Sequence, residues 1–341
     1  MKSGINQAAV TILDLGGSDD GHRAQYFAFL GQLFAIRRVR LNWRLLVDPD
    51  PVLVPMIEES LAVYALVGVM RSLIGRRTAG FLFRPGPAIS NQSLRHRIKY
   101  WVLRLLRLIP RIQTLTILPF AVEPRFAEVA DGWIYDPQIW DLHWPRALSA
   151  APSGGVLSDA IHQAASGRSI CVALGRQDVS KGFDQFAAVY AASAPLRDAS
   201  LFAYGGKVAP SCAAAAAEFA ALGGYGIDRF IDDTELLDLY GCADQVWCAY
   251  APDYDQASGI LGRAMQLGIP VVVRNGSLVH RLCRIEALPH VPVDRSTAWQ
   301  AIAAPPQRET LDVAATRARR HGEVSIVQLC AALGVKGPHS G

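Results

Sequence analysis

Short apolar segments alternate with longer amphipathic segments along most of the chain. In the first half, this pattern predicts strands at 10–15, 40–47, 78–84 and 113–119, with helices at about 22–36, 54–73 and 92–109. In the second half, it predicts strands at 169–174, 201–204, 227–231, 245–249 and 271–274. Helices are expected between them at 183–192, 210–221, 234–242 (with Thr234 as N-cap) and 258–267, and a last helix at 308–333. Such alternation is typical of parallel sheets covered by helices.

Residues 145–168 interrupt this rhythm with small and turn-forming residues, which is typical of a domain boundary. We therefore expect an N-terminal Rossmann-like domain at 1–150 and a C-terminal Rossmann-like domain at 151–307. Residues 308–341 are expected to form a helix and tail that pack back on the first domain. The predicted fold class is α/β, with two doubly wound domains that face each other across a cleft. In such sheets ligands bind outside the carboxyl ends of the strands, so the loops after strands are the places to search for chemistry.

Composition excludes several classes of protein. Apolar residues make up 51% and charged residues 19% of the 341 residues, which excludes a disordered chain. The longest apolar runs, such as 61–70, are half of the ~20 residues that a spanning helix needs. The N-terminus has no basic region followed by an apolar one, so we expect a cytoplasmic protein. The six cysteines form no CxxC pair and are expected to be buried, reduced thiols.

Charge is unevenly distributed. Residues 60–122 hold ten Arg or Lys and no Asp or Glu, although the net charge of the whole chain is only +4. Within this block, residues 94–111 predict a helix with Arg97, Arg104 and Arg107 beside an apolar face that includes Trp101. The other members of that face are Leu94, Ile98, Val102, Leu105, Leu108 and Ile109. A cationic amphipathic helix with Trp and Leu indicates docking on anionic lipid. The alternative is a domain helix whose apolar face packs on the sheet. Nucleic-acid binding is disfavoured, because the interleaved residues are aliphatic.

Two loops in the second half have the residues of an anion site. Gly175 to Gly182 follows a predicted strand and contains Arg176 and Lys181, two cations that could hold a diphosphate. Ser258 and Gly259 stand at a predicted helix start, where free N–H groups and the helix dipole favour an anion. The alternative for the first loop is a solvated basic loop, and the alternative for the second is an ordinary turn between a strand and a helix.

Taken together, these segments resemble a known family. The segment GRQDVSKGFDQF is similar to the glycine–arginine…lysine–glycine loop of GT-B glycosyltransferases, in particular the large retaining family 4. LFAYGG and the long segment from RFIDDTELL to GIPVVVRNGS resemble that family's next strand and its donor-binding region. The resemblance covers residues 168–285, about a third of the chain.

The resemblance implies a role for each matching residue. Arg176 and Lys181, beside Gly175, would neutralise the diphosphate of a nucleotide-sugar donor, and the N–H groups of Ser258, Gly259 and Ile260 would bind the same phosphates. The nucleotide base would lie at Phe230 and Ile231, next to Asp232. Asp255 would lie near the sugar, in the place of the first glutamate of the family's E-x7-E motif. The second glutamate is replaced by Arg263, which cannot accept hydrogen bonds from a ribose and indicates a divergent branch.

The first half supplies the acceptor side in this interpretation. Gly17, Gly21 and His22 lie in the turn after the first strand, and Arg84 follows the strand at 78–84. The aspartates of that turn would repel a dinucleotide, which disfavours a nicotinamide-dependent enzyme. The formal D-x-D at 253–255 could bind a divalent metal, but the resemblance implies a metal-independent enzyme without a cofactor.

The sequence thus predicts a retaining glycosyltransferase. It would move a sugar from a nucleotide-diphosphate sugar to an acceptor hydroxyl on a lipid-linked cell-surface saccharide, at the inner face of the membrane. Exopolysaccharide or lipopolysaccharide synthesis is the expected context. One alternative is a degenerate, non-enzymatic relative that binds a nucleotide or docks on a membrane as a partner subunit. The other is a sugar-nucleotide epimerase on the same fold.

Overall fold

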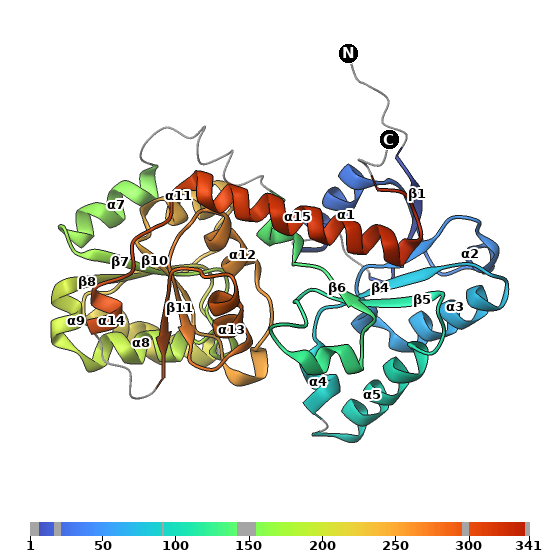
Figure 1. Cartoon of the computed structure of the whole chain (residues 1–341). Helices are drawn as coiled ribbons and strands as arrows, with labels where there is room; N and C mark the ends of the chain where they lie inside the picture. The colour runs from blue at the N-terminus through green and yellow to red at the C-terminus, as the bar shows by residue number, and fades with distance from the viewer. Residues whose placement is uncertain (1–6, 17–21, 91, 142–154, 295–299, 338–341) are drawn as a thin grey trace, which may run out of the picture. The chain divides into compact units, whose positions relative to one another are not determined.

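The computed structural model describes residues 7–16, 22–90, 92–141, 155–294 and 300–337. The chain divides into two compact units, Met1–Pro137 with Arg320–Gly341 and Gln138–Arg319. Each unit contains a six-stranded sheet, and all the strand pairings within the described residues are parallel (Figure 1). The predicted fold class, two Rossmann-like α/β domains, is confirmed.

The division differs in detail from the boundaries expected from the sequence. The first unit ends at Pro137, earlier than the expected residue 150, and the small-residue segment at 142–154 lies outside the described residues. The last helix, α15 (Leu311–Leu333), begins in the second unit and contributes its residues from Arg320 onward to the first. There Ser325 Oγ accepts the Tyr135 N–H at 3.0 Å, and Arg77 donates to the carbonyl of Ala331.

The first sheet has the strand order β2-β1-β3-β4-β5-β6. Its strands are β1 (Ala9–Leu13), β2 (Ala35–Val39), β3 (Val52–Val54), β4 (Thr78–Leu82), β5 (Ile112–Thr116) and β6 (Gly132–Trp133). The accompanying helices are α1 (His22–Leu33), α2 (Trp43–Val47), α3 (Leu61–Leu73), α4 (Pro85–Ser90) and α5 (Leu94–Leu106). Short 3-10 helices lie at η1 (Ile57–Glu59), η2 (Pro124–Glu128) and η3 (Pro137–Ile139).

The helices of the first unit form two layers. The chain moves along the sheet in one direction from β1 to β2, and in the other direction from β3 through β4 to β5. Because parallel crossovers are right-handed, α1 covers one face of the sheet, and α3 and α5 cover the other. Figure 1 shows the same arrangement, with α1 and the part of α15 from Arg320 onward above the strands, and α3 and α5 below them.

The predicted strand at 40–47 is wrong. The strand β2 lies earlier, at Ala35–Val39, and Trp43–Val47 forms α2, whose N-cap Asn42 accepts a hydrogen bond from Leu45 N–H at 3.3 Å. β2 is a largely exposed edge strand with two arginines, so it lacks the apolar pattern by which buried strands are found. The predicted helix at 54–73 likewise contains the end of β3, and its α-helical part begins only after the N-cap Ser60.

A buried arginine holds α2 and the following segment to the sheet. Arg71 of α3 is fully buried, and its guanidinium donates to the backbone carbonyls of Leu45, Asp48, Asp50 and Arg77. These carbonyls lie at the end of α2, in the turn before β3 and just before β4. Those of Leu45 and Arg77 also accept the N–H groups of Asp48 and Val52. The guanidinium has five donors in a fixed plane, so one side chain satisfies several segments at once.

The second sheet has the order β12-β11-β10-β7-β8-β9. Its strands are β7 (Ser169–Leu174), β8 (Ser200–Gly205), β9 (Tyr225–Ile227), β10 (Gln245–Cys248), β11 (Val271–Arg274) and β12 (His290–Val293). Its α-helices are α7 (Val156–Ala165), α8 (Phe183–Ala192), α9 (Ala194–Ala199), α10 (Ala213–Ala221), α11 (Asp233–Cys242), α12 (Gly259–Gln266), α13 (Leu278–Ile285) and α14 (Gln300–Ala303). Short 3-10 helices lie at η4 (Val179–Lys181), η5 (Pro210–Cys212) and η6 (Pro252–Tyr254).

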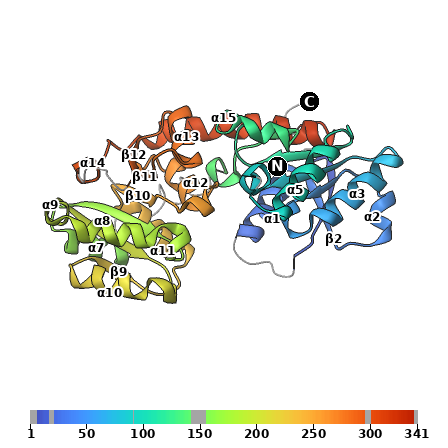
Figure 2. The same ribbon diagram turned by 90° about the horizontal axis from the view of Figure 1, so that it is seen from below.

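An aromatic cluster fills one side of the second sheet. Phe186 lies at its centre, with ring centroids 4.8 Å from Phe202, 5.4 Å from Phe219 and 5.4 Å from Trp247. Figure 2 shows α9 next to α8 on this side of the unit. The helix α7 lies instead beside α11, where the Leu157 N–H donates to Asp238 Oδ2 at 2.9 Å. The six cysteines are free and buried, as the sequence predicts.

Two local predictions in this unit are wrong. The strand expected at 227–231 ends at Ile227, because the chain turns there toward α11. The N-cap of α11 is Asp232 and not Thr234; Asp232 and Glu235 form a capping box that satisfies two backbone N–H groups.

The burial of Arg71 gives the first prediction. Replacing Arg71 by Met should lower the free energy of unfolding of the first unit by about 3–5 kcal/mol, because four carbonyls lose a shared donor. Urea denaturation measures the change, and the exposed Arg111→Met variant is the control. Equal midpoints for the two variants would contradict it.

Candidate active site

The candidate site lies where the chain reverses direction in the second sheet. β7 is the first strand of this sheet, with β8 on one side and β10 on the other. The chain therefore leaves β7 toward one side of the sheet and leaves β10 toward the other. Open α/β sheets bind ligands at such a switch point, outside the carboxyl ends of the strands. The loop after β7 contains η4, and the loop after β10 contains η6 and leads into α12.

Glycine permits the backbones of these loops to approach closely. Gly206 has φ 141°, and a Cβ at this position would lie 1.8 Å from the carbonyl oxygen of Gly175. Gly182 has φ 74°, and a Cβ there would lie 2.2 Å from the carbonyl oxygen of Ala249. Trp247 donates its indole N–H to the Gly182 carbonyl at 3.2 Å. These contacts hold the loops after β7, β8 and β10 together.

Gln177 fixes the path of the loop after β7. Its buried side chain donates to the carbonyls of Ala173 at 3.2 Å and Gly175 at 2.7 Å. Its backbone N–H donates to Lys207 O, and its own carbonyl accepts from Ala209 N–H. The predicted basic loop is thus an ordered segment tied to its neighbour after β8.

The structure places the two predicted cations at either end of this ordered loop. Arg176 is exposed, and its Nε lies 3.3 Å from Asp178 Oδ2. Lys181 Nζ lies 4.8 Å from the ring centroid of Tyr250 and 4.4 Å from that of Tyr254. Asp178 accepts the Lys181 backbone N–H at 3.0 Å and so fixes the turn that carries both cations. The two aromatic faces stabilise the ammonium group at the end of β10.

The start of α12 retains donors that the helix itself does not use. Its N-cap Ser258 makes no capping hydrogen bond, because its Oγ lies 2.7 Å from the hydroxyl of the buried Tyr250. In the next helix, α13, the N-cap Ser277 accepts the His280 N–H in the usual way. Ile260 lies beside the loop after β7, since a Cβ on Gly175 would be 3.8 Å from its Cδ1. The first turn of α12 thus brings Ser258, Gly259 and Ile260 to the predicted anion loop.

Asp255 is held by neighbouring groups. Its carboxylate accepts from the Arg274 guanidinium at 2.8 Å and from the Leu278 N–H at 2.9 and 3.1 Å. Burial raises the pKa of this carboxyl, while Arg274 and the Leu278 N–H oppose the rise. The aspartate thereby joins β11 and α13 to the loop after β10. Among the described residues, no group of three or more His, Cys, Asp or Glu could hold a metal ion.

The segment predicted to receive the base has mixed exposure. Phe230 is 80% exposed, and Ile231 packs near the end of β8, with Cγ1 3.5 Å from where a Gly205 Cβ would stand. Arg229 pairs with Glu235, and this ion pair together with the Asp232 N–H lowers the pKa of Glu235 to about 2. Phe230 is therefore available as an exposed aromatic surface at this edge.

Arg263, which stands in the place of the second glutamate of the family's E-x7-E motif, has a packing role. The side chain is buried, and its Nη1 lies 2.5 Å from Asp141 Oδ1 and 3.3 Å from Gln266 Oε1. Gln266 also donates to the same Asp141 oxygen at 3.0 Å. The neighbouring Gly262 allows close approach, since a Cβ there would be 2.8 Å from the Gln138 carbonyl. The Arg263 guanidinium thus anchors the 138–141 segment to α12.

The acceptor-side residues predicted in the first unit are only partly described. Gly17 and Gly21 lie outside the described residues, and His22 begins α1 in a segment whose side chain is likewise not described. Arg84 follows β4 and is exposed; its N–H donates to Glu58 Oε1 at 2.7 Å, and its carbonyl accepts from Lys99 Nζ at 3.2 Å.

The cationic helix α5 exposes its apolar stripe. Leu94, Ile98, Trp101 and Leu105 are between 54% and 71% exposed, whereas Leu103 and Leu106 are buried against the sheet. These four residues therefore do not pack on the sheet, whereas Val102 and Ile109 of the same stripe are half-buried. Arg97, Arg104 and Arg107 are exposed beside it, with Arg104 5.6 Å from the Trp101 ring and Arg107 3.5 Å from Asp131. None of the helices formed by the described residues is long and apolar enough to cross a membrane.

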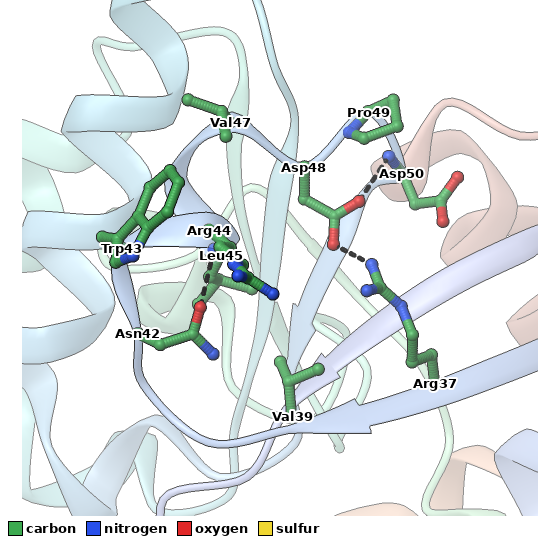
Figure 3. A pocket seen from close by; sticks show the side chains of 10 residues that line it. All are labelled: Arg37, Val39, Asn42, Trp43, Arg44, Leu45, Val47, Asp48, Pro49 and Asp50. Atoms are coloured by element: carbon green, nitrogen blue, oxygen red, sulfur yellow. Dashed lines mark hydrogen bonds and ion pairs between the residues drawn. The ribbon is translucent and has the colours of Figure 1, made fainter.

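A further cavity, of about 660 Å³, lies in the first unit beside α2 (Figure 3). Two of its charged groups are paired: Arg37 binds one oxygen of Asp48, and the other oxygen accepts the Asp50 N–H at 3.1 Å. The sequence predicts no site residue here. The cavity is lined by Arg37, Val39, Asn42, Trp43, Arg44, Leu45, Val47, Asp48, Pro49 and Asp50.

Comparisons with solved structures identify the fold. A trehalose-6-phosphate enzyme from E. coli bound with UDP-2-fluoro glucose aligns with a TM-score of 0.60 and 10% identity, over 97% of this chain and 100% of that chain. The trehalose 6-phosphate synthase of Burkholderia multivorans gives a TM-score of 0.63 and 10% identity, over 96% and 98% of the two chains. The synthase of Burkholderia xenovorans in complex with glucose-6-phosphate gives 0.58 and 13%, over 84% and 74%.

These matches establish the GT-B fold of two Rossmann-like domains. No protein-family model and no curated sequence matches the chain. The narrower resemblance to retaining family 4 stays a prediction.

Several residues that organise the site are missing from the sequence prediction. Tyr250 and Tyr254 lie under Lys181, and Gln177 fixes the loop between the two cations. The position of Tyr250 directly after the predicted strand at 245–249 is the one signal that could have indicated it.

The Arg263–Asp141 contact gives the second prediction. Replacing Arg263 by Glu places two carboxylates together in a buried position, so the second unit should lose about 3–5 kcal/mol of unfolding free energy. Denaturation with urea measures this loss. The double variant Arg263→Glu/Asp141→Arg should regain most of it, and failure of the exchanged pair to rescue would count against the anchoring role.

Proposed function

We propose that this protein is a glycosyltransferase that transfers a sugar from a nucleotide-diphosphate sugar to an acceptor hydroxyl. The observation that carries the proposal is that two loops follow the carboxyl ends of the adjacent strands β7 and β10. The first contains Arg176 and Lys181, and the second leads into the uncapped first turn of α12. Cations and free backbone N–H groups on neighbouring loops suit the binding of a diphosphate. The fold is that of proteins with bound nucleotide-sugar analogues, which is consistent with this assignment.

In this proposal, catalysis depends on stabilising the departing diphosphate. As the bond between the anomeric carbon and the diphosphate breaks, the electron pair and its negative charge move onto the phosphate oxygen. The acceptor oxygen forms the new glycosidic bond with the anomeric carbon, and its proton passes to the departing diphosphate oxygen. Lys181, held between two aromatic rings, and the N–H groups of Gly259 and Ile260 would interact more strongly with this charge than with the intact donor. The remaining rate enhancement would come from the positioning of donor and acceptor.

In this proposal, Asp255 is a positioning residue for the loop beside the sugar. Both of its oxygens already accept hydrogen bonds from Arg274 and Leu278, so it would orient the loop beside the sugar. Retention of the anomeric configuration and independence of metal and cofactor follow from the resemblance to family 4, and are part of the proposal.

The acceptor that we propose is a saccharide carried on a lipid at the inner face of a membrane. The exposed apolar stripe of α5 and its neighbouring arginines support contact with anionic lipid. One structural neighbour, the synthase of Burkholderia xenovorans, is in complex with glucose-6-phosphate, a sugar phosphate without a lipid. An acceptor assay should therefore compare lipid-linked saccharides with sugar phosphates.

The third prediction concerns the donor site. At about 100 times its Kd, one of the diphosphates UDP, GDP, ADP or TDP should stabilise the protein by about 2.7 kcal/mol, which raises the Tm of a unit of this size by roughly 5–10 °C. Arg176→Ala/Lys181→Ala should abolish this shift because both cations are lost. A thermal-shift measurement over the four nucleotides tests it.

The control for this prediction is Arg284→Ala/Arg319→Ala, which removes two exposed arginines of the same unit outside the loops. It should keep the full shift. Absence of any shift in the wild-type protein would overturn the donor site and favour a non-enzymatic partner protein. Nucleotide binding followed by epimerised donor, without transfer, would favour the epimerase.

The fourth prediction concerns α5. Ile98→Glu/Leu105→Glu should reduce co-sedimentation with vesicles of phosphatidylglycerol and phosphatidylcholine by at least about tenfold, because burying each side chain favours binding by about 1.5–3 kcal/mol. Val313→Glu/Val327→Glu on α15 is the matched control, since both valines are more than half exposed. Equal binding of the two variants would remove α5 from the lipid contact.

A further inference from the structure

Helix α3 has a second apolar face that the sheet does not cover. Its buried side contains Tyr64, Val67, Gly68 and Arg71. Its opposite side exposes large apolar residues at helical spacing: Leu66 at 60%, Met70 at 43%, Leu73 at 77%, and Ile74 at 52% directly after the helix. A surface helix in water normally carries polar residues on that side. The composition of α3 is therefore that of a helix with an apolar environment on both sides.

Helix α2 and the residue before its cap show the same feature on a smaller scale. Leu41, Trp43 and Val47 are 49%, 70% and 56% exposed, and Leu45 is the buried residue of the helix. Figure 3 shows Trp43 and Val47 on the side of the cavity away from the paired Arg37. Arg44 lies 5.7 Å from the Trp43 ring, as Arg104 lies 5.6 Å from the Trp101 ring of α5.

These apolar stripes belong to one layer of the first unit, formed by α2, α3 and α5. Arg71 of α3 binds the carbonyl of Leu45 in α2, so the two helices are in direct contact. At the other side of α3, a Cβ at Gly75 would lie 3.9 Å from Arg111, just after α5. Twelve of the nineteen large apolar residues exposed among the described residues lie between 41 and 108, which identifies this layer as the main apolar surface.

The charge of this layer identifies its partner. The segment 60–122 has ten basic and no acidic residues, and Arg44, Arg95, Arg97, Arg104 and Arg111 are exposed. Of the carboxylates that border the layer, Glu58 is paired with Lys99, Asp131 with Arg107, and Glu128 accepts from Tyr100. Glu59, just before the N-cap of α3, is exposed. Apolar side chains next to arginines, in a segment that contains no acidic residue, complement an anionic lipid surface. An acidic protein partner would not require apolar stripes on three helices.

We propose that the whole α2–α3–α5 layer docks on an anionic bilayer, with Trp43, Leu66 and Leu73 entering the lipid together with the stripe of α5. This inference rests on the proposed membrane association through α5 and extends it. One amphipathic helix contacts the bilayer along a line, about which the unit could roll. Three adjacent stripes define a plane, so the sheet of the first unit would lie along the membrane with α1 on the side away from it.

The experiment uses fluorophores attached to single introduced cysteines. The six native cysteines are buried, so a thiol-reactive environment-sensitive dye will label an introduced surface cysteine selectively. The variants are Val47→Cys on α2, Leu66→Cys on α3 and Ile98→Cys on α5, with Val327→Cys on α15 as the control. All four positions are exposed apolar residues. On addition of phosphatidylglycerol vesicles, we expect a blue shift at positions 47, 66 and 98 and none at 327.

Each other result has a defined meaning. A blue shift at position 98 with none at positions 47 and 66 would overturn docking through the whole layer and leave docking through α5 alone. No shift at any position would overturn membrane association itself, independently of the donor site. A shift without vesicles that grows with protein concentration would show a second copy on this surface and overturn the lipid assignment. Shifts of equal size with pure phosphatidylcholine would overturn the requirement for anionic lipid.

A second experiment measures vesicle binding by unlabelled protein, so no dye is attached to the α2–α3–α5 layer. Leu66→Glu/Leu73→Glu changes two exposed positions of α3 and leaves its buried side intact, so it should fold normally. We expect at least about a tenfold loss of vesicle binding relative to Val313→Glu/Val327→Glu. Binding equal to that control would overturn the contribution of α3.

Discussion

The candidate site depends on close backbone contacts in the second unit. Gly206 meets the carbonyl of Gly175, and Gly182 meets the carbonyl of Ala249, at distances that exclude any side chain. Without these approaches the loops after β7, β8 and β10 could not meet at one edge of the sheet. Lys181 would then lose its position over Tyr250 and Tyr254, and the start of α12 would separate from the basic loop.

The sequence predicts this region well because its signals are local. A buried parallel strand followed by a glycine-bounded loop is visible in the pattern, and the strand at 169–174, for example, is found as predicted. Prediction from the sequence fails where contacts between distant residues determine the structure or the role of a side chain. The edge strand β2 has no apolar pattern, and Asp255 has the residue type of a catalytic group but is held by Arg274 and Leu278. The role of Arg263 depends on Asp141, more than a hundred residues away.

The first unit shows a different limit of prediction. The pattern correctly indicates α5 as an amphipathic cationic helix, but a helical pattern does not say which apolar face meets the sheet. Leu103 and Leu106 do so, and the stripe around Trp101 does not. On α3 the apolar residues surround the helix, so only the three-dimensional structure separates the core residues from the exposed ones.

The division of the chain has a consequence for synthesis. The second unit is inserted in the first, because residues 320–337 return to the sheet that begins the chain. Ser325 binds Tyr135, and the side chain of Arg77 contacts the end of the same helix. On the ribosome, the first unit therefore cannot complete its core until the entire second unit has been made. The inserted unit is continuous in sequence, so all of its residues are available for folding before those of the first unit.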